Sequence, residues 1–279
     1  MKKLVRFFEI DLQYLSITTL PFSEKIRNVL ITDLTIFRNL FFSKSSFPPI
    51  NISGNMISYD TRYATKSFLV GAYDLYNESK RFSIFDNNAV VVDIGSNIGQ
   101  YLFALKTSVP QARVYSVEAD PIIFKLLKKN ASNLNKVKIF QKILSNKSGS
   151  MNFYTSKKFS TWSTLVKPED DDAYTKTKVE VVDGDSLFED LKHVDLLKID
   201  VEGAEWEVLM GLKKTLKKSK YILIEISITR DRVDPGSSKI VQFLLKNGFH
   251  IHHIGRIFTN GVGMDQSAGN FLFKSNSEK

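Results

Sequence analysis

A run of seven residues, DIGSNIG from Asp93 to Gly99, has the composition of a ligand-binding turn. The apolar stretch AVVV precedes it and a segment of helical composition follows, so the sequence predicts a strand, a tight turn and a helix. Gly95 and Gly99 would let the backbone come close to a ligand at the N-terminus of that helix. Such turns hold nucleotide-like ligands, and the residues around the glycines decide which one.

The acidic residue before the first glycine favours a ligand with a cationic end. A dinucleotide fingerprint has three glycines, G-x-G-x-x-G, and a carboxylate beside it would repel a pyrophosphate. Asp93 instead suits S-adenosylmethionine, which carries an ammonium and a sulfonium group, while Ser96 and Asn97 add polar groups to the turn. No G-x-x-x-x-G-K-[ST] run is present, so we do not expect an ATP-binding loop.

Glu118 and Ala119 come at the end of the next apolar run. An acidic residue at the end of the second strand can accept hydrogen bonds from both ribose hydroxyls, of NAD or of S-adenosylmethionine. Glu118 alone therefore does not separate the two cofactors. Together with the Asp93 turn it favours S-adenosylmethionine, and an NAD-dependent dehydrogenase remains the weakest enzyme alternative.

Three further carboxylates are candidate catalytic groups. Asp200 follows the apolar run VDLLKI, where it could contact the methionine part of the cofactor or act as base for a hydroxyl acceptor. Glu202 precedes Gly203 and could equally stabilise a helix N-terminus. Glu225 interrupts the apolar run YILIEIS, and a buried carboxylate must be paired or protonated. The three together could hold Mg²⁺, an alternative that the residues leave open although we expect no metal site.

These motifs occur together in a known family. On DIGSNIGQY (93–101), VEADP (117–121), IDVEGAEWEVLMG (199–211), LIEIS (223–227) and NFLF (270–273), the chain resembles the FkbM-type methyltransferases, a branch of the class I S-adenosylmethionine-dependent enzymes. The resemblance covers residues 65–275. It implies a Rossmann-like fold and O-methylation of a carbohydrate, glycolipid or secondary-metabolite hydroxyl. Ser96 and Asp74 depart from the residues commonest in the family, a small aliphatic residue and Glu.

The alternation of apolar and amphipathic segments predicts the elements that position these residues. We expect a doubly wound α/β fold with a mostly parallel seven-stranded sheet, whose last two strands pair antiparallel. The predicted strands are 89–95, 113–119, 136–144, 194–203, 221–227, 249–257 and 270–275, with extra strands at 149–156 and 178–184. The predicted helices are 97–108, 121–133 (with Asp120 as N-cap), 204–217 and 237–248.

The N-terminal part of the chain has a different composition. Residues 1–46 are rich in Phe, Leu and Ile and look helical, and a loop rich in Ser, Pro, Gly and Asn follows at 43–55. We therefore expect a helical extension over 1–46 and a methyltransferase domain over 47–279. The aromatic pairs of the extension would also suit peripheral contact with a membrane or a partner. Glu9 and Asp11 interrupt the first apolar stretch, so we expect a cytoplasmic protein rather than a secreted one.

Composition narrows the remaining alternatives. The chain has no cysteine, which excludes disulfides, thiolate zinc sites and a cysteine nucleophile. The net charge of +9 suggests a nucleic-acid methyltransferase as an alternative, but its lysine runs at 125–130 and 211–220 read as solvated helix faces. We therefore expect a small-molecule or glycan acceptor; a catalytically silent scaffold that binds the cofactor is the other alternative.

A few aromatic and histidine residues carry weaker signals. His250, His252 and His253 lie in one predicted strand, where His250 and His252 share a face, and surface positions are the commoner reading for such residues. Tyr101 and Trp162 could line the pocket or belong to the core.

Overall fold

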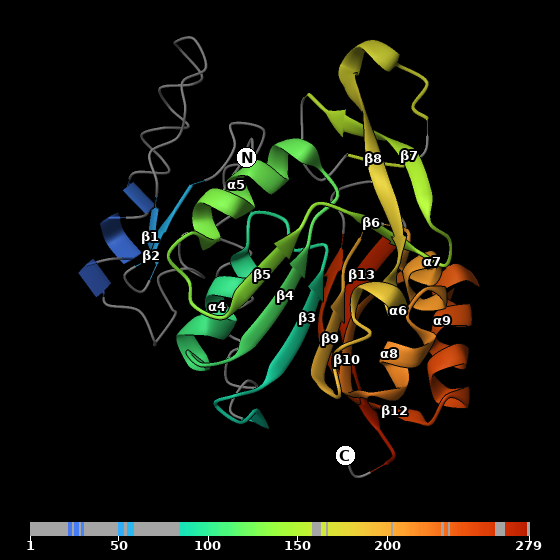
Figure 1. Ribbon diagram of the computed structural model, residues 1–279. Coiled ribbons are helices and arrows are strands. Elements are labelled where there is room, and N and C mark those ends of the chain that lie inside the picture. The colour runs from blue at the N-terminus through green and yellow to red at the C-terminus, as the bar shows by residue number, and fades with distance from the viewer. Residues whose placement is uncertain are drawn as a thin grey trace.

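The computed structural model describes residues 84–157, 163–165, 167–201, 203–229, 232–233, 235–259 and 266–277, together with short stretches at 22–23, 25–27, 29–30, 50–52 and 55–58. Most of these residues form one twisted sheet with helices on both faces and a small second sheet beyond its edge (Figure 1).

The main sheet confirms the predicted doubly wound topology. Its order is β12-β13-β10-β9-β3-β4-β5, and the two-residue strand β11 adds to β10 as an eighth member. Pairing is parallel from β10 through β5, whereas β13 lies antiparallel between β10 and β12, as predicted for the last two strands. The strands are β3 (Val90–Ile94), β4 (Arg113–Val117), β5 (Val137–Phe140), β9 (Val194–Ile199), β10 (Ser219–Thr229), β11 (Arg232–Val233), β12 (Phe249–Thr259) and β13 (Gln266–Ser275).

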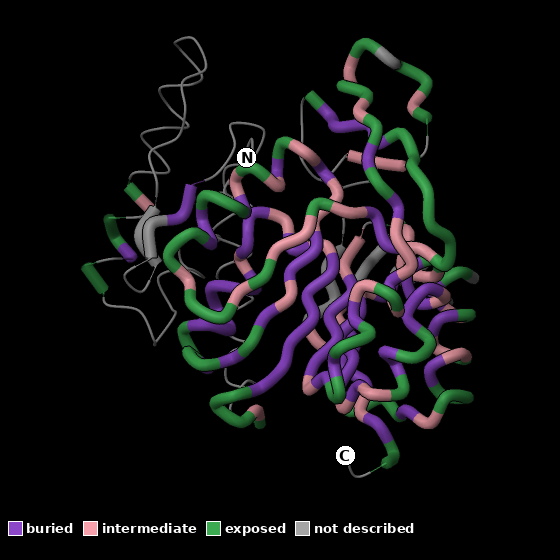
Figure 2. Tube along the Cα trace, viewed as in Figure 1, coloured by how far each residue is buried: buried purple, intermediate pink, exposed green. Residues whose placement is uncertain are grey.

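Apolar side chains on the two faces of this sheet form two cores. One face packs on α4 (Gln100–Ser108) and α5 (Pro121–Ala131), around residues such as Leu102 and Leu127. The other packs on α7 (Glu205–Met210), α8 (Lys213–Lys217) and α9 (Pro235–Lys246). Figure 2 shows the central strands buried along most of their length, as expected for a sheet covered on both faces.

The connection between β5 and β9 carries a small sheet, with strand order β6-β8-β7. It consists of β6 (Ile143–Ser145), β7 (Gly149–Ser156) and β8 (Tyr174–Asp183), with a 3-10 turn at Asp171–Ala173 and a short α6 (Gly184–Leu187). The predicted single strand 136–144 was therefore wrong: β5 ends at Phe140, and β6 pairs with β8 instead of continuing in the main sheet. The extra strands predicted at 149–156 and 178–184 are confirmed, the second one beginning earlier.

Two predicted helices also differ from the structure. The helix predicted from 97 begins at Gln100, because Asn97 and Gly99 have positive φ values of 51° and 97°. The helix predicted over 204–217 is broken into α7 and α8. Asp185 of α6 accepts the N–H groups of Lys214 and Thr215 and so caps the start of α8.

The N-terminal residues are described only in part. β1 (Ile50–Ile52) and β2 (Asn55–Ile57) form a small antiparallel hairpin. It is tied to α5 because Ser58 donates its N–H to Asn130 Oδ1 and accepts Asn130 Nδ2 at its carbonyl. Most of the predicted extension over 1–46 lies outside the described residues. Of the helices in the described part of the chain, none is long and apolar enough to cross a membrane.

Candidate functional site

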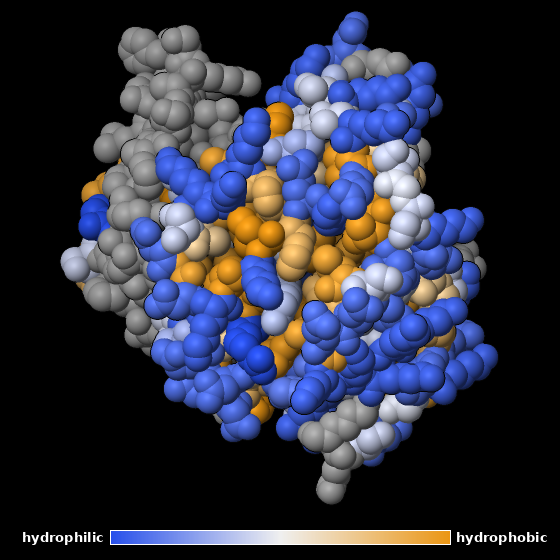
Figure 3. All heavy atoms as spheres, viewed as in Figure 1, coloured by the Kyte–Doolittle hydropathy of each residue, from blue (hydrophilic) through white to orange (hydrophobic). Residues whose placement is uncertain are grey.

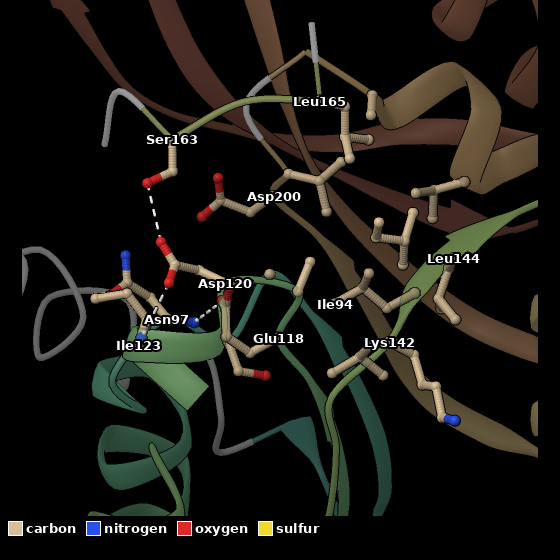
Figure 4. A pocket seen from close by; sticks show the side chains of 18 of the residues that line it. Ile94, Asn97, Glu118, Asp120, Ile123, Lys142, Leu144, Ser163, Leu165 and Asp200 are labelled. Carbon is tan, nitrogen blue, oxygen red and sulfur yellow. Dashed lines mark hydrogen bonds between the residues drawn. The ribbon is translucent and has the colours of Figure 1, made fainter. Parts of the chain in front are cut away.

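A cavity of about 640 Å³ lies where β3, β4 and β9 end, between these strands and the small sheet. Six predicted cofactor residues line it, namely Gly95, Ser96, Asn97, Glu118, Ala119 and Asp200. Apolar residues of β6 and β7, among them Leu144 and Phe153, line the other side. Figure 4 shows Asn97, Glu118 and Asp120 on one side of this cavity and Ile94 and Leu144 on the other. Figure 3 shows apolar side chains gathered in a strip through the middle of the face in view, with hydrophilic flanks.

The turn after β3 depends on Gly95. Its φ is +78°, and a Cβ added there would lie 1.7 Å from the carbonyl oxygen of Asp200. Asp200 in turn donates its N–H to the carbonyl oxygen of Ile94. Only glycine therefore lets the first turn pack directly against the end of β9.

Gly99 and Asn97 set the start of α4. Gly99 is the N-cap, in the left-handed region, and provides no side-chain cap, while the first turn of α4 contains no acidic residue. Asn97 accepts the N–H of Ile98 with its own Oδ1. Gly99 does not line the cavity but turns the chain so that Gln100 and Tyr101, the first residues of α4, do.

Glu118 joins the first two turns. Its Oε2 accepts the N–H of Asn97 and its Oε1 accepts the N–H of Asp120, both at 2.8 Å. Burial raises the pKa of Glu118 to about 7, although these two hydrogen bonds favour the ionised form. A carboxyl group that titrates near neutrality thus lies where the sequence predicts ribose recognition.

Asp93 lies behind the cavity rather than on its lining. The residue is fully buried, and neither carboxylate oxygen accepts a hydrogen bond within the described part of the chain. Burial raises the pKa of Asp93, and the positive charge of Lys198 opposes that rise. The Nζ of Lys198 lies 3.4 Å from Asp93 Oδ1, 3.1 Å from Asp200 Oδ2 and 3.5 Å from the carbonyl oxygen of Gly95.

Asp200 and Glu225 belong to neighbouring strands. Ile199 pairs with Ile224, so the residues that follow them lie next to each other at the same edge of the sheet. Burial raises the pKa of Glu225 to about 7, and the charges of Asp200 and Glu205 add to this effect. Asp200 lines the cavity, with 35% of its side chain exposed, whereas Glu225 does not line it.

A polar bridge closes the cavity on the side of α5. Asp120 caps α5, as predicted, by accepting the N–H groups of Ile122 and Ile123 at Oδ1. Its Oδ2 accepts the hydroxyl of Ser163, and Ser163 Oγ also accepts the N–H of Ser156 at the end of β7. Ser163 thereby links the small sheet to the start of α5 (Figure 4).

Other predicted residues lie elsewhere. The three histidines of β12, His250, His252 and His253, do not line the cavity. His250 and His252 are exposed, and their ring centroids lie 6.4 Å apart, which confirms the prediction that they share a face of the strand. Glu202, Trp162 and Asp74 lie outside the described residues. In the described part of the chain, no group of three or more His, Asp or Glu could hold a metal ion.

Two residues of the site, Lys198 and Ser163, were not predicted from the sequence. Lys198 had a readable signal, because a lysine inside the apolar run VDLLKI must find a partner when the strand is central. Ser163 had none, because its role comes from a contact with Asp120 across 43 residues of chain.

Known proteins similar to this chain include methyltransferases. The family model described as "Methyltransferase FkbM domain" matches residues 93–251, more than half of the chain. The 2-O-methyltransferase NoeI of Sinorhizobium fredii is 26% identical over 153 residues, which are 50% of this chain and 63% of that protein. The hexuronic acid methyltransferase AglP of Haloferax volcanii is 28% identical over 152 residues, 53% of this chain and 60% of that protein.

The chain thus spans less than two thirds of the length of these two relatives. Among solved structures, M. jannaschii TYW2 in complex with AdoMet aligns with a TM-score of 0.48 at 14% identity, over 84% of this chain and 89% of that one. The match of the family model places the turn of Asp93, the Glu118 bridge and Asp200 inside one domain, and the chain belongs to the FkbM methyltransferase family.

Proposed function

We propose that this chain transfers the methyl group of S-adenosylmethionine to a hydroxyl group of a carbohydrate, glycolipid or secondary metabolite. The observation that carries the proposal is the Glu118 carboxylate, held by backbone N–H groups of both turns that face the cavity. It lies where a doubly wound fold binds ribose hydroxyls. Membership of the FkbM family supports a methyl donor over a dinucleotide.

The lining of the cavity fits this cofactor. Glu118 would bind the ribose, and the apolar side chains of Ile143, Leu144 and Phe153 would pack against the adenine. The N-terminus of α4 would receive the carboxylate of the methionine part, since backbone N–H groups at a helix start favour an anion. Asp93 is fully buried and so acts through Lys198 rather than by direct contact.

Asp200 would take the proton of the acceptor. It lines the cavity, and Lys198 holds its Oδ2, which leaves Oδ1 for the acceptor hydroxyl. When bound, S-adenosylmethionine supplies a methyl group on a sulfonium. Asp200 would accept the hydroxyl proton as the acceptor oxygen bonds to the methyl carbon and the S–C bond breaks. Glu225 would support Asp200 from the next strand, and Glu202 remains a predicted catalytic residue.

The charge of the cavity favours a neutral acceptor. Its lining contains the carboxylates of Glu118, Asp120, Asp200 and Glu207. Its two lysines are both paired, Lys142 with Glu180 and Lys198 with Asp93 and Asp200. Phosphates would be repelled here, which disfavours a nucleic acid. The name of NoeI, a 2-O-methyltransferase, supports transfer to oxygen, and the name of AglP, a hexuronic acid methyltransferase, supports a sugar-like acceptor.

The test combines calorimetry with a transfer assay. We expect the wild-type protein to bind S-adenosylmethionine and S-adenosylhomocysteine with micromolar Kd, and NAD not at all. A labelled methyl donor is then incubated with neutral glycosides, uronic acids, glycolipids and RNA. Label in a glycoside or glycolipid that is lost in Asp200→Asn supports the proposal. Binding without transfer to any acceptor would favour the scaffold alternative, and label in RNA would overturn the acceptor class.

A further inference from the structure

Lys198 is a buried cation that contacts both the turn after β3 and Asp200 at the end of β9. It lies on β9 with a side chain only 9% exposed, yet it lines the cavity. Its Nζ contacts Asp93 and the Gly95 carbonyl on the side of the first turn, and Asp200 on the rim. The ring of Tyr101, from the start of α4, lies 5.5 Å from the same Nζ.

The register of the sheet produces this arrangement. Lys198 pairs with Asp93 across β9 and β3, so the two side chains leave the sheet on the same face. Asp200 lies two residues further on, and residues two apart along a strand point to the same side. Lys198 therefore contacts both Asp93, which precedes the turn at Gly95, and Asp200, which lines the cavity.

The charges of these groups depend on one another. Burial alone would lower the pKa of Lys198, but the negative charges of Asp200 and Asp93 raise it above its usual range, so the lysine stays charged. Neither carboxylate oxygen of Asp93 accepts a hydrogen bond among the described residues, and Lys198 is the cation in contact with Oδ1. A buried charge left without its partner is strongly destabilised.

We infer that Lys198 is a positioning residue that fixes the turn at Gly95 and the side chain of Asp200 relative to each other. This inference rests on the proposed function and deepens it, because it makes cofactor binding at the turn depend on a group on the acceptor side. Lys198 fixes the turn through the Gly95 carbonyl and Asp93, and it orients Asp200 by binding Oδ2. Loss of the Lys198 charge would therefore free both the turn at Gly95 and the Asp200 carboxylate.

Another buried lysine of similar exposure provides a matched control. Lys106 on α4 is 8% exposed as a residue, against 7% for Lys198. Its Nζ donates to the carbonyl oxygens of Pro110 and Ala112, and it does not line the cavity. Replacement of either lysine by methionine removes a buried charge of the same kind. Only Lys198→Met removes contacts with the turn and with Asp200.

The experiment measures the affinity for S-adenosylhomocysteine by calorimetry, beside the melting temperature, for the full chain. We expect Lys198→Met to weaken binding at least tenfold and Lys198→Arg, which keeps the charge but has a bulkier head group, to weaken it less than Lys198→Met does. Lys106→Met is expected to lower Tm while binding stays within about threefold. In addition, Asp200→Asn should weaken binding in the wild-type background and have no further effect in Lys198→Met.

The outcomes separate the inference from the proposed function. If the wild-type protein does not bind S-adenosylhomocysteine, the proposed cofactor is wrong. If wild type binds and Lys198→Met binds equally well, or if the effects of Asp200→Asn and Lys198→Met are additive, Lys198 has no positioning role. If Lys198→Met does not fold, the Asp200→Asn variant provides the test. An affinity for S-adenosylhomocysteine equal to that of wild type would show that Asp200 and the turn at Gly95 are not coupled.

Discussion

Glu118 is the residue on which ribose binding depends in the proposed function. Its carboxylate accepts two backbone hydrogen bonds, and burial raises its pKa to about 7. The ionised form is the better acceptor for ribose hydroxyls, so the affinity for S-adenosylhomocysteine should fall as pH is lowered from 8 to 6. We expect Glu118→Gln to bind at least tenfold more weakly at pH 8 and to lose this pH dependence. Calorimetry at several pH values measures both effects.

Glu207 provides the control for that change. It lines the same cavity and is exposed, so Glu207→Gln removes a carboxylate without touching the bridge between the turns. We expect its affinity and pH profile to match those of wild type. An equal loss in both variants would mean that general negative charge, and not the Glu118 bridge, favours the cofactor.

Glu225 should make stability fall as pH rises. Burial raises its pKa to about 7 in the folded protein, so between about pH 4.5 and 7 the folded state binds more protons than the unfolded state. The free energy of unfolding therefore decreases across this window. We expect Glu225→Gln to reduce that decrease by about 2 to 3 kcal/mol in urea titrations at pH 5 and pH 8, because about two pKa units separate pH 5 from the folded-state value and each unit is worth about 1.4 kcal/mol. A slope unchanged from wild type would contradict the burial of this charge.

Among the elements, the turn between β3 and α4 allows the least substitution. In Gly95→Ala the new Cβ would meet the Asp200 carbonyl oxygen at 1.7 Å, in addition to the strain of a φ of +78°. Gly248, between α9 and β12, has a φ of +83° with nothing within 4 Å of an added Cβ. We expect Gly248→Ala to cost about 1 kcal/mol from backbone strain alone. Gly95→Ala should cost clearly more and abolish cofactor binding; equal losses in urea unfolding would show that the turn can move away from β9.

The bridge between the small sheet and α5 is expected to affect binding more than stability. Ser163→Ala removes the hydrogen bonds to Asp120 and Ser156 on the side of the cavity next to α5. We expect S-adenosylhomocysteine to dissociate a few times faster, with Tm nearly unchanged, in stopped-flow measurements. Ser132→Ala, which removes a hydroxyl bonded to Lys129 at the other end of α5, is the control. A dissociation rate equal to that of Ser132→Ala would exclude a closing role for Ser163.

The elements also show what the sequence could and could not predict. Strand and helix alternation predicted the doubly wound, mostly parallel main sheet, because apolar runs and capping residues such as Asp120 are local signals. The site residues at strand ends followed from the same topology. The division of residues 136–144 into β5 and β6 could not be predicted from local sequence, because β6 pairs with β8, about 40 residues later in the chain. The break between α7 and α8 depends on Asp185, and the burial of Asp93 depends on its pairing with Lys198.

At the scale of the whole molecule, the exposed lysines of α5 and α8 lie away from the cavity. The chain carries a net charge of +9, yet the cavity contains more carboxylates than lysines. The lysines of the runs predicted to be solvated faces, among them Lys125, Lys128, Lys213 and Lys214, are exposed on α5 and α8, and none of these four lines the cavity. A polyanion should therefore bind to the surface and not to the site.

We expect a single-stranded RNA oligonucleotide to bind weakly at low salt, to lose affinity steeply between 50 and 200 mM salt, and not to displace S-adenosylhomocysteine. Replacement of Lys125, Lys128, Lys213 and Lys214 by Glu should abolish RNA binding in fluorescence anisotropy, because these side chains are exposed and attract phosphates. The same variant should keep wild-type affinity for S-adenosylhomocysteine, because none of the four touches the cavity. RNA that competes with the cofactor, or that binds this variant as tightly as wild type, would mean that a nucleic acid reaches the site itself and would reopen the nucleic-acid alternative.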